Sequence, residues 1–152
     1  KTTQDLIQNT ISHETPPVDE MGRTASGLLL LTNDSALQKK LEDNPKIKMV
    51  YHIKLAKPLS AMAKDNLIKG IKIQKKIYAI KKISYLEGKA KTEIGIEVFG
   101  LNSGMLTKLF SKLELSIIYL DRVRLAGFTK KDLARGQWRY LSKKEISFLK
   151  MF

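Results

Sequence analysis

Residues 17–34 read Pro17-Val-Asp-Glu-Met-Gly-Arg-Thr-Ala-Ser-Gly-Leu-Leu-Leu-Leu-Thr-Asn-Asp34, and this run sets the order of the first structural elements. It contains a short apolar segment of strand length, Leu28–Thr32. Residues 33–35 (Asn-Asp-Ser) follow as helix-capping residues, and Leu37 and Leu41 then recur at helical spacing. The run therefore predicts a strand, a cap and a helix, in that order.

Helical and strand patterns are mixed through the rest of the chain, without an internal repeat. Helices are expected at Ser60–Lys69, which ends at Gly70, at Gly104–Leu113, and after Ser142, where Ser142 and Glu145 match a capping box. Strands are expected at Met49–Leu55, Ser116–Leu120 and Gln137–Leu141, and Ile71–Phe99 alternates as a continuous β meander. This mixture indicates an α+β fold built on a mostly antiparallel sheet.

Length and composition limit the classes of protein that are possible. The chain has 152 residues, 43% of them hydrophobic, which is enough for one domain with its own core. Cysteine is absent, which excludes disulfides and thiolate metal ligands and favours an intracellular, cytoplasmic setting. The longest apolar run, Leu28–Leu31, is far shorter than the roughly 20 residues of a membrane span, so a soluble protein without a membrane partner is expected.

The charge is strongly positive. The 28 Lys and Arg residues outnumber the 15 Asp and Glu residues, and the net charge of +13 is typical of a protein that binds RNA or DNA. The alternative is that lysines merely solvate the surface. Arginine occurs at only five positions, so most of the charge is lysine, which favours contact with the phosphate backbone over base reading.

A group of lysines follows the predicted β meander. They are Lys72, Lys75, Lys76, Lys81 and Lys82. Several of them fall on adjacent predicted strands, which favours a strip that follows a phosphate backbone, although a solvated face is the alternative.

Residues 17–34 resemble a motif of the RsuA/RluB/RluE/RluF-type ribosomal RNA pseudouridine synthases, which reads roughly Pro-Val-Gly-Arg-Leu-Asp-x-x-Thr-Ser-Gly-Leu-Leu-Leu-Leu-Thr-Asn-Asp. The likeness spans essentially the whole chain. It continues at Tyr51-His-Ile-Lys-Leu with Pro58-Leu59, at Gly70-Ile71, and at Leu120-Asp-Arg-Val-Arg-Leu-Ala-Gly127 with Leu133, Gly136, Trp138-Arg139 and Leu141.

The resemblance implies a pseudouridine synthase-like fold, a long, bent, mixed sheet with flanking helices and an RNA-binding cleft across its middle. It implies one catalytic-type domain over residues 1–152, without the S4-type RNA-binding domain and the first strand that relatives usually carry before this point. It also implies ribosomal RNA as the partner, a monomer, and no cofactor, since the isomerisation is redox-neutral.

The positions that carry the chemistry of this family have changed. The nucleophilic Asp falls on Gly22, the Arg two residues before it falls on Glu20, and the Lys two residues before the stacking Tyr falls on Met49. Of the four arginines of a later motif, which aligns with residues 100–110, only Lys108 keeps a basic side chain. The apolar positions persist, so the resemblance implies a catalytically degenerate member, a pseudoenzyme that binds RNA through Arg23, Lys108 and the five lysines of the meander.

Three further possibilities stay open. Tyr51, the family's base-stacking residue, is equally well explained as a strand aromatic in the core. Asp19 is the best substitute nucleophile if the chain is an active isomerase, but the loop before Ser26 would have to shift by three residues. A third possibility is an interaction module whose cleft receives an acidic protein. His13 and His52 are too few and too far apart for a metal site, and none is expected.

Overall fold

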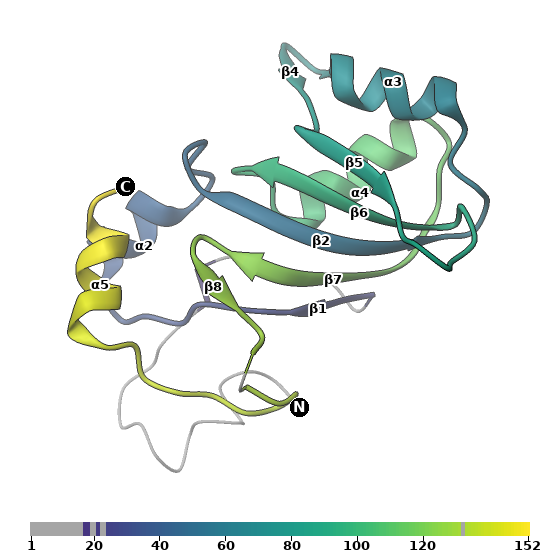
Figure 1. Ribbon diagram of the computed structural model, residues 1–152. Coiled ribbons are helices and arrows are strands. Elements are labelled where there is room, and N and C mark those ends of the chain that lie inside the picture. Colours follow the sequence, from purple (N-terminus) through teal and green to yellow (C-terminus); the bar gives the residue numbers. More distant parts are fainter. Residues whose placement is uncertain (1–16, 19–20, 22–23, 132) are drawn as a thin grey trace.

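The structure is a computed structural model that describes residues 17–18, 21, 24–131 and 133–152 (Figure 1). Its helices and strands are, in chain order, β1 (Ala25–Gly27), α2 (Ser35–Leu41), β2 (Lys48–Leu55), α3 (Ala61–Lys69), β3 (Ile71–Ile73), β4 (Lys76–Tyr78), β5 (Lys82–Tyr85), β6 (Glu93–Phe99), α4 (Ser103–Lys112), β7 (Ile117–Leu125), β8 (Phe128–Thr129) and α5 (Lys143–Lys150).

One main sheet organises the molecule. Its strand order is β1-β7-β2-β6-β5, and β8 pairs with β7 (Figure 1). Strand β2 is antiparallel to both β6 and β7, whereas the short β1 runs parallel to β7. The sheet is therefore mostly antiparallel, and the prediction of an α+β fold is confirmed.

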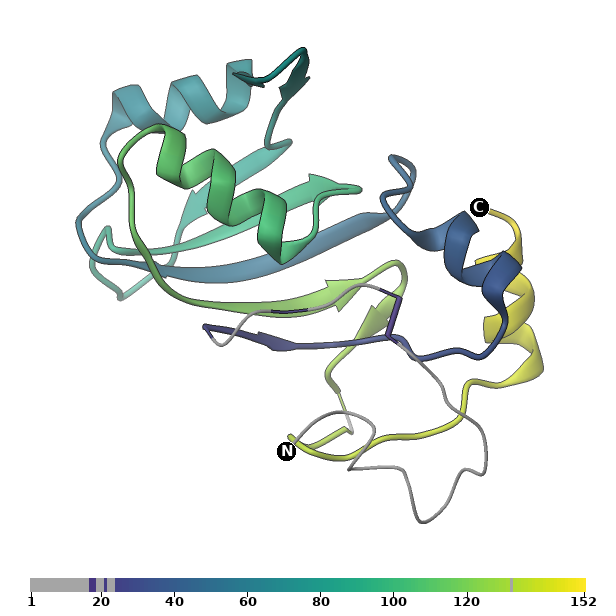
Figure 2. The same cartoon turned by 180° about the vertical axis from the view of Figure 1, so that it is seen from behind.

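The core lies on one face of this sheet. In β2 the buried residues Met49, Tyr51, Ile53 and Leu55 alternate with residues that point to the other face, as the period of two in a strand requires. Helix α4 covers the buried face and lies in front of the sheet in Figure 2. Helices α2 and α5 contact each other at one end of β2 and β7, so the middle of the buried face lies between two groups of helices (Figure 2).

The predicted helix boundaries are confirmed where capping residues were recognised. The Asp34 carboxylate accepts hydrogen bonds from the backbone amides of Ala36 and Leu37, both at 3.1 Å. Ser60 caps α3, and the helix ends at Gly70. At α5, Ser142 and Glu145 form the complete capping box. Each of these side chains satisfies a backbone amide that the first turn of a helix leaves without a partner.

The apolar run Leu28–Thr32 is not a strand, and this part of the prediction is wrong. The strand is β1, and it ends at Gly27, where φ is +110° and the chain leaves the regular ladder. The leucines continue in an extended conformation that is joined to the chain ahead of it by a bridge between Pro17 and Leu31. Leu28 and Leu30 still pack against the core, which explains why the run is apolar.

The four strands that the pattern of Ile71–Phe99 predicts are confirmed as β3, β4, β5 and β6, but their pairing in one continuous meander is wrong. Strands β3 and β4 form a separate small sheet, and β5 pairs with β6 in the main sheet. Between β4 and β5 the chain turns toward the end of α3, where the Ile80 amide donates to the Leu67 carbonyl at 3.0 Å. The side chains of these two residues are buried, so core packing overrides strand pairing at this point.

The segment Gln137–Leu141, which the sequence predicts as a strand, is a loop, so this prediction is wrong. The segment starts with a turn in which the Gln137 amide donates to the Ala134 carbonyl at 3.0 Å, and it does not pair with another strand.

In the part of the chain that the structure describes, no helix is long and apolar enough to cross a membrane.

Candidate functional site

Three neighbouring strands bring the centre of the site together. Tyr51 of β2 lies opposite Arg122 of β7, and Arg122 lies opposite Gly27 of β1. Both side chains of the first pair point to the buried face of the sheet, where they are shielded from solvent. The parallel pairing of β1 with β7 thus places the start of the leucine run beside the tyrosine.

Arg122 is the functional candidate that sequence reasoning missed. Its side chain is fully buried, its Nε donates to the Leu28 carbonyl at 2.8 Å, and its Nη1 lies 4.0 Å from Met49 Sδ. Burying a guanidinium costs free energy unless its N–H donors find partners, and these contacts supply partners for the Arg122 side chain. The signal was available, since Arg122 shares the strand phase of the buried Leu120 and an arginine at an inward position is unusual.

Tyr51 is fully buried as well. Its hydroxyl donates to the Leu101 carbonyl at 3.1 Å and lies 3.4 Å from Met49 Sδ. The phenol therefore joins the middle of β2 to the chain just before α4. A role in base stacking stays a prediction, and in this conformation the ring contacts the core rather than solvent.

Gly27 allows β1 to approach β7 closely. A Cβ built at this position would lie 2.3 Å from the Arg122 carbonyl oxygen, 2.5 Å from its amide nitrogen and 2.7 Å from Asp121 Oδ1. Its φ of +110° is also a conformation that residues with a side chain rarely adopt. The glycine of the Ser26-Gly27 pair is therefore required by the contact with the backbone of Arg122.

A small apolar cavity lies beside Met49. Its volume is about 20 Å³, and its lining includes Leu30, Leu41, Leu125 and Leu149. A space of this size holds about one water molecule. A uracil ring therefore does not fit the cavity as it stands.

The six lysines that are predicted to contact RNA are all exposed. Lys72, Lys75 and Lys76 lie on the β3–β4 hairpin, Lys81 and Lys82 lie at the start of β5, and Lys108 lies on α4. Helix α4 contacts β3, which brings Lys108 to the same part of the molecule as the hairpin. The meander that linked the five lysines in the sequence prediction is divided between two sheets.

Other predicted site residues lie outside the described part of the structure. They are Asp19, Gly22 and Arg23, together with Glu20 and His13. The roles proposed for them stay predictions. Among the residues that the structure does describe, no group of three or more His, Asp or Glu side chains is placed to hold a metal ion.

The fold is similar to that of a protein of known crystal structure, a pseudouridylate synthase, with a TM-score of 0.81 at 19% sequence identity. The match covers 97% of this chain and 65% of that one, so this chain spans less than two thirds of its length. The sequence matches no protein-family model and no curated protein. The likeness establishes the fold, a pseudouridine synthase-like arrangement of a mostly antiparallel sheet with flanking helices.

Proposed function

We propose that this chain is an RNA-binding protein of pseudouridine synthase-like fold that has lost the isomerase reaction, and that its target is ribosomal RNA in the cytoplasm. The net charge of +13 supports a polyanionic partner. The similar fold of a pseudouridylate synthase makes RNA the natural choice among polyanions.

The carrying observation is that, among the residues that the structure describes, the buried side chains around Tyr51 leave no space for a base. An enzyme that modifies a nucleobase has to flip that base out of the stack and into a pocket that matches its shape. In this chain the Tyr51 ring is fully buried, its hydroxyl is bonded to Leu101, and the cavity beside Met49 measures about 20 Å³. These contacts favour a role for Tyr51 and Met49 in stabilising the fold, rather than in binding a flipped base.

The sequence positions agree with this proposal. Gly22 stands where the resembled family has its nucleophile, and a glycine has no group that can attack or accept a proton. Met49 stands where that family has a lysine, and its sulfur lies against Tyr51 and Arg122. An apolar side chain in place of a cation removes charge from the centre of the site, while the exposed lysines keep the outer surface basic.

RNA binding is tested by fluorescence anisotropy with labelled ribosomal RNA fragments over a range of salt concentrations. We expect the logarithm of the association constant to fall by roughly 0.7 to 0.9 for each phosphate contact per tenfold rise in salt. An affinity that does not change with salt would contradict the proposal, and so would equal affinity for an acidic protein surface. Crosslinking in cells followed by sequencing identifies the RNA that is bound.

Catalysis is tested by the release of tritium from 5-tritiated uridine in total RNA from cells that lack the gene. We expect no release above background. Release would show instead that an active isomerase uses another carboxylate, and Asp19→Asn would then be the next variant. Loss of release with unchanged RNA binding in that variant would assign the nucleophile to Asp19.

A further inference from the structure

The segment Leu133–Lys144, which runs from the loop after β8 into the first turn of α5, combines aromatic and cationic side chains. Between Leu133 and Lys144 the chain carries Arg135, Arg139, Lys143 and Lys144, with no Asp or Glu among them. Asp132 and Glu145 flank this segment. In Figure 1 the loop passes below β1 on its way to α5, and none of its residues lines the cavity beside Met49.

Tyr140 is the most exposed tyrosine side chain that the structure describes, at 69% of its full accessibility. Its ring packs edge to face with Trp138, with 5.2 Å between the centroids and 83° between the planes. Such a pair fixes the orientation of both rings. It also leaves the exposed ring of Tyr140 in contact with water.

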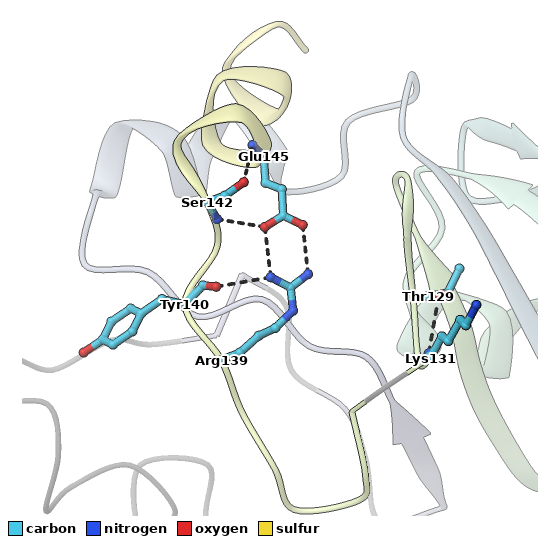
Figure 3. A network of polar contacts seen from close by, with 6 residues as sticks. All are labelled: Thr129, Lys131, Arg139, Tyr140, Ser142 and Glu145. Carbon is cyan, nitrogen blue, oxygen red and sulfur yellow. Dashed lines mark hydrogen bonds and ion pairs between the residues drawn. The ribbon is translucent and has the colours of Figure 1, made fainter.

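A polar network holds the backbone around Tyr140 (Figure 3). Arg139 forms a bidentate ion pair with Glu145, with Nη1–Oε1 at 2.9 Å and Nη2–Oε2 at 2.8 Å. The same Nη1 donates to the Tyr140 carbonyl at 3.2 Å, and Glu145 Oε1 also accepts from the Ser142 amide at 2.8 Å. A separate bond lies where the chain leaves β8, and in it the Lys131 amide donates to the Thr129 hydroxyl at 3.4 Å.

Two consequences follow from this network. The backbone is fixed on both sides of Tyr140, while its ring points away from the ion pair (Figure 3). The pair also neutralises Arg139, so the cations of the segment Leu133–Lys144 that lack a described carboxylate partner are Arg135, Lys143 and Lys144. The segment thus presents a preorganised ring beside a local excess of positive charge, which lowers the ordering cost of binding an anionic chain.

We propose that Tyr140, oriented by Trp138, is a stacking platform for an unpaired base of single-stranded RNA, and that Lys143, Lys144 and Arg135 contact the neighbouring phosphates. Proteins that bind single-stranded nucleic acid combine these two features, aromatic rings for the bases and a basic surface for the backbone. None of the residues of the platform lines the cavity beside Met49. It rests on the proposed function, because it names which form of RNA is held and where.

The test measures the affinity of the whole chain for a labelled oligouridine and for an RNA duplex of the same length. Tyr140→Ala is expected to weaken oligouridine binding by roughly 5- to 150-fold, the range for loss of one stacked base. Tyr140→Phe keeps the ring and is expected to bind as the parent does. Met62→Ala is the matched control, because Met62 is another large exposed side chain, at 75%, on α3, which carries none of the predicted RNA contacts.

The chain contains one tryptophan, so its fluorescence gives a second readout. Because the Trp138 ring is 5.2 Å from that of Tyr140, oligouridine is expected to change its emission in the parent and in Tyr140→Phe. The slope of affinity against salt should stay the same in Tyr140→Ala, which removes no charge, and should fall by about 0.7 in Lys143→Ala.

Three results would overturn the platform. They are unchanged oligouridine affinity in Tyr140→Ala, an equal loss of affinity for the duplex, and Trp138 emission that does not respond to bound oligouridine. If the parent binds RNA but any of these is observed, the platform alone is wrong. If the parent binds neither oligouridine nor ribosomal RNA, the proposed function and the platform are both wrong.

Discussion

Replacing Gly27 with alanine tests whether the contact between β1 and β7 holds the site together. The new Cβ would lie 2.3 Å from the Arg122 carbonyl oxygen and 2.5 Å from its amide nitrogen. Contacts between carbon and other heavy atoms are favourable at about 3.5 to 4.0 Å, so the strands must separate by about 1 Å. Both clashing atoms belong to the backbone of β7 and have no side-chain freedom to escape.

The expected loss of stability has three parts. A residue with a side chain held at φ +110° costs about 1 to 3 kcal/mol. The Arg122 carbonyl accepts the Leu28 amide at 3.0 Å, and losing that bond costs about 1 kcal/mol. The charged bond from Arg122 Nε to the Leu28 carbonyl adds about 1.5 kcal/mol or more. We therefore expect Gly27→Ala to lower the free energy of unfolding by about 4 kcal/mol.

The assay is urea unfolding followed by the emission of the single tryptophan and by circular dichroism. Gly88→Ala is the matched control, because Gly88 also has a positive φ, +74°, but a Cβ there meets nothing within 4 Å. The control is expected to lose about 1 kcal/mol from backbone strain alone. A Gly27→Ala variant within about 1 kcal/mol of Gly88→Ala would refute the argument from close approach.

Two further predictions concern single side chains. Tyr51→Phe removes the hydroxyl that the Leu101 carbonyl accepts, so we expect a loss of about 1 kcal/mol in urea unfolding and an unchanged affinity for ribosomal RNA; unchanged stability would contradict this. The hydrogen bonds from Arg139 and from the Ser142 amide lower the pKa of Glu145 from 4.5 to about 2. A carboxylate whose pKa is lowered in the folded state stabilises the fold above pH 4.5, and this stability is lost as the pH falls toward 2. Trp138 emission is therefore expected to change between pH 4.5 and pH 2 in the parent and to stay constant in Glu145→Gln.

Sequence reasoning succeeded where local chemistry determines the structure. The Ser142–Glu145 capping box and the Asp34 and Ser60 caps each satisfy amides within the same turn, so the residues themselves specify the boundary. The alternation of Met49–Leu55 fixes which face of β2 is buried, because a strand has a period of two. The pseudouridine synthase-like fold was predicted from the family resemblance, which rests on the order of several sequence motifs rather than on any one of them.

It failed where long-range packing determines the structure. An apolar run such as Leu28–Thr32 looks the same whether it packs in a strand or in an extended segment beside one. The alternation at Gln137–Leu141 has no ladder partner, and nothing local in the sequence shows this. The burial of Arg122 depends on Met49 and Leu28, which are far from it in the chain, so the centre of the site became visible only in the fold.

The pairing of β1 with β7 also sets the order in which the protein is completed during synthesis. Leu28 and Arg122 are separated by 94 positions in the chain. At roughly 5 to 20 residues per second, a ribosome needs about 5 to 20 s to add that many residues. Throughout that interval the leucines after Gly27 are made but have no strand to join, and the segment can dock only when β7 leaves the exit tunnel.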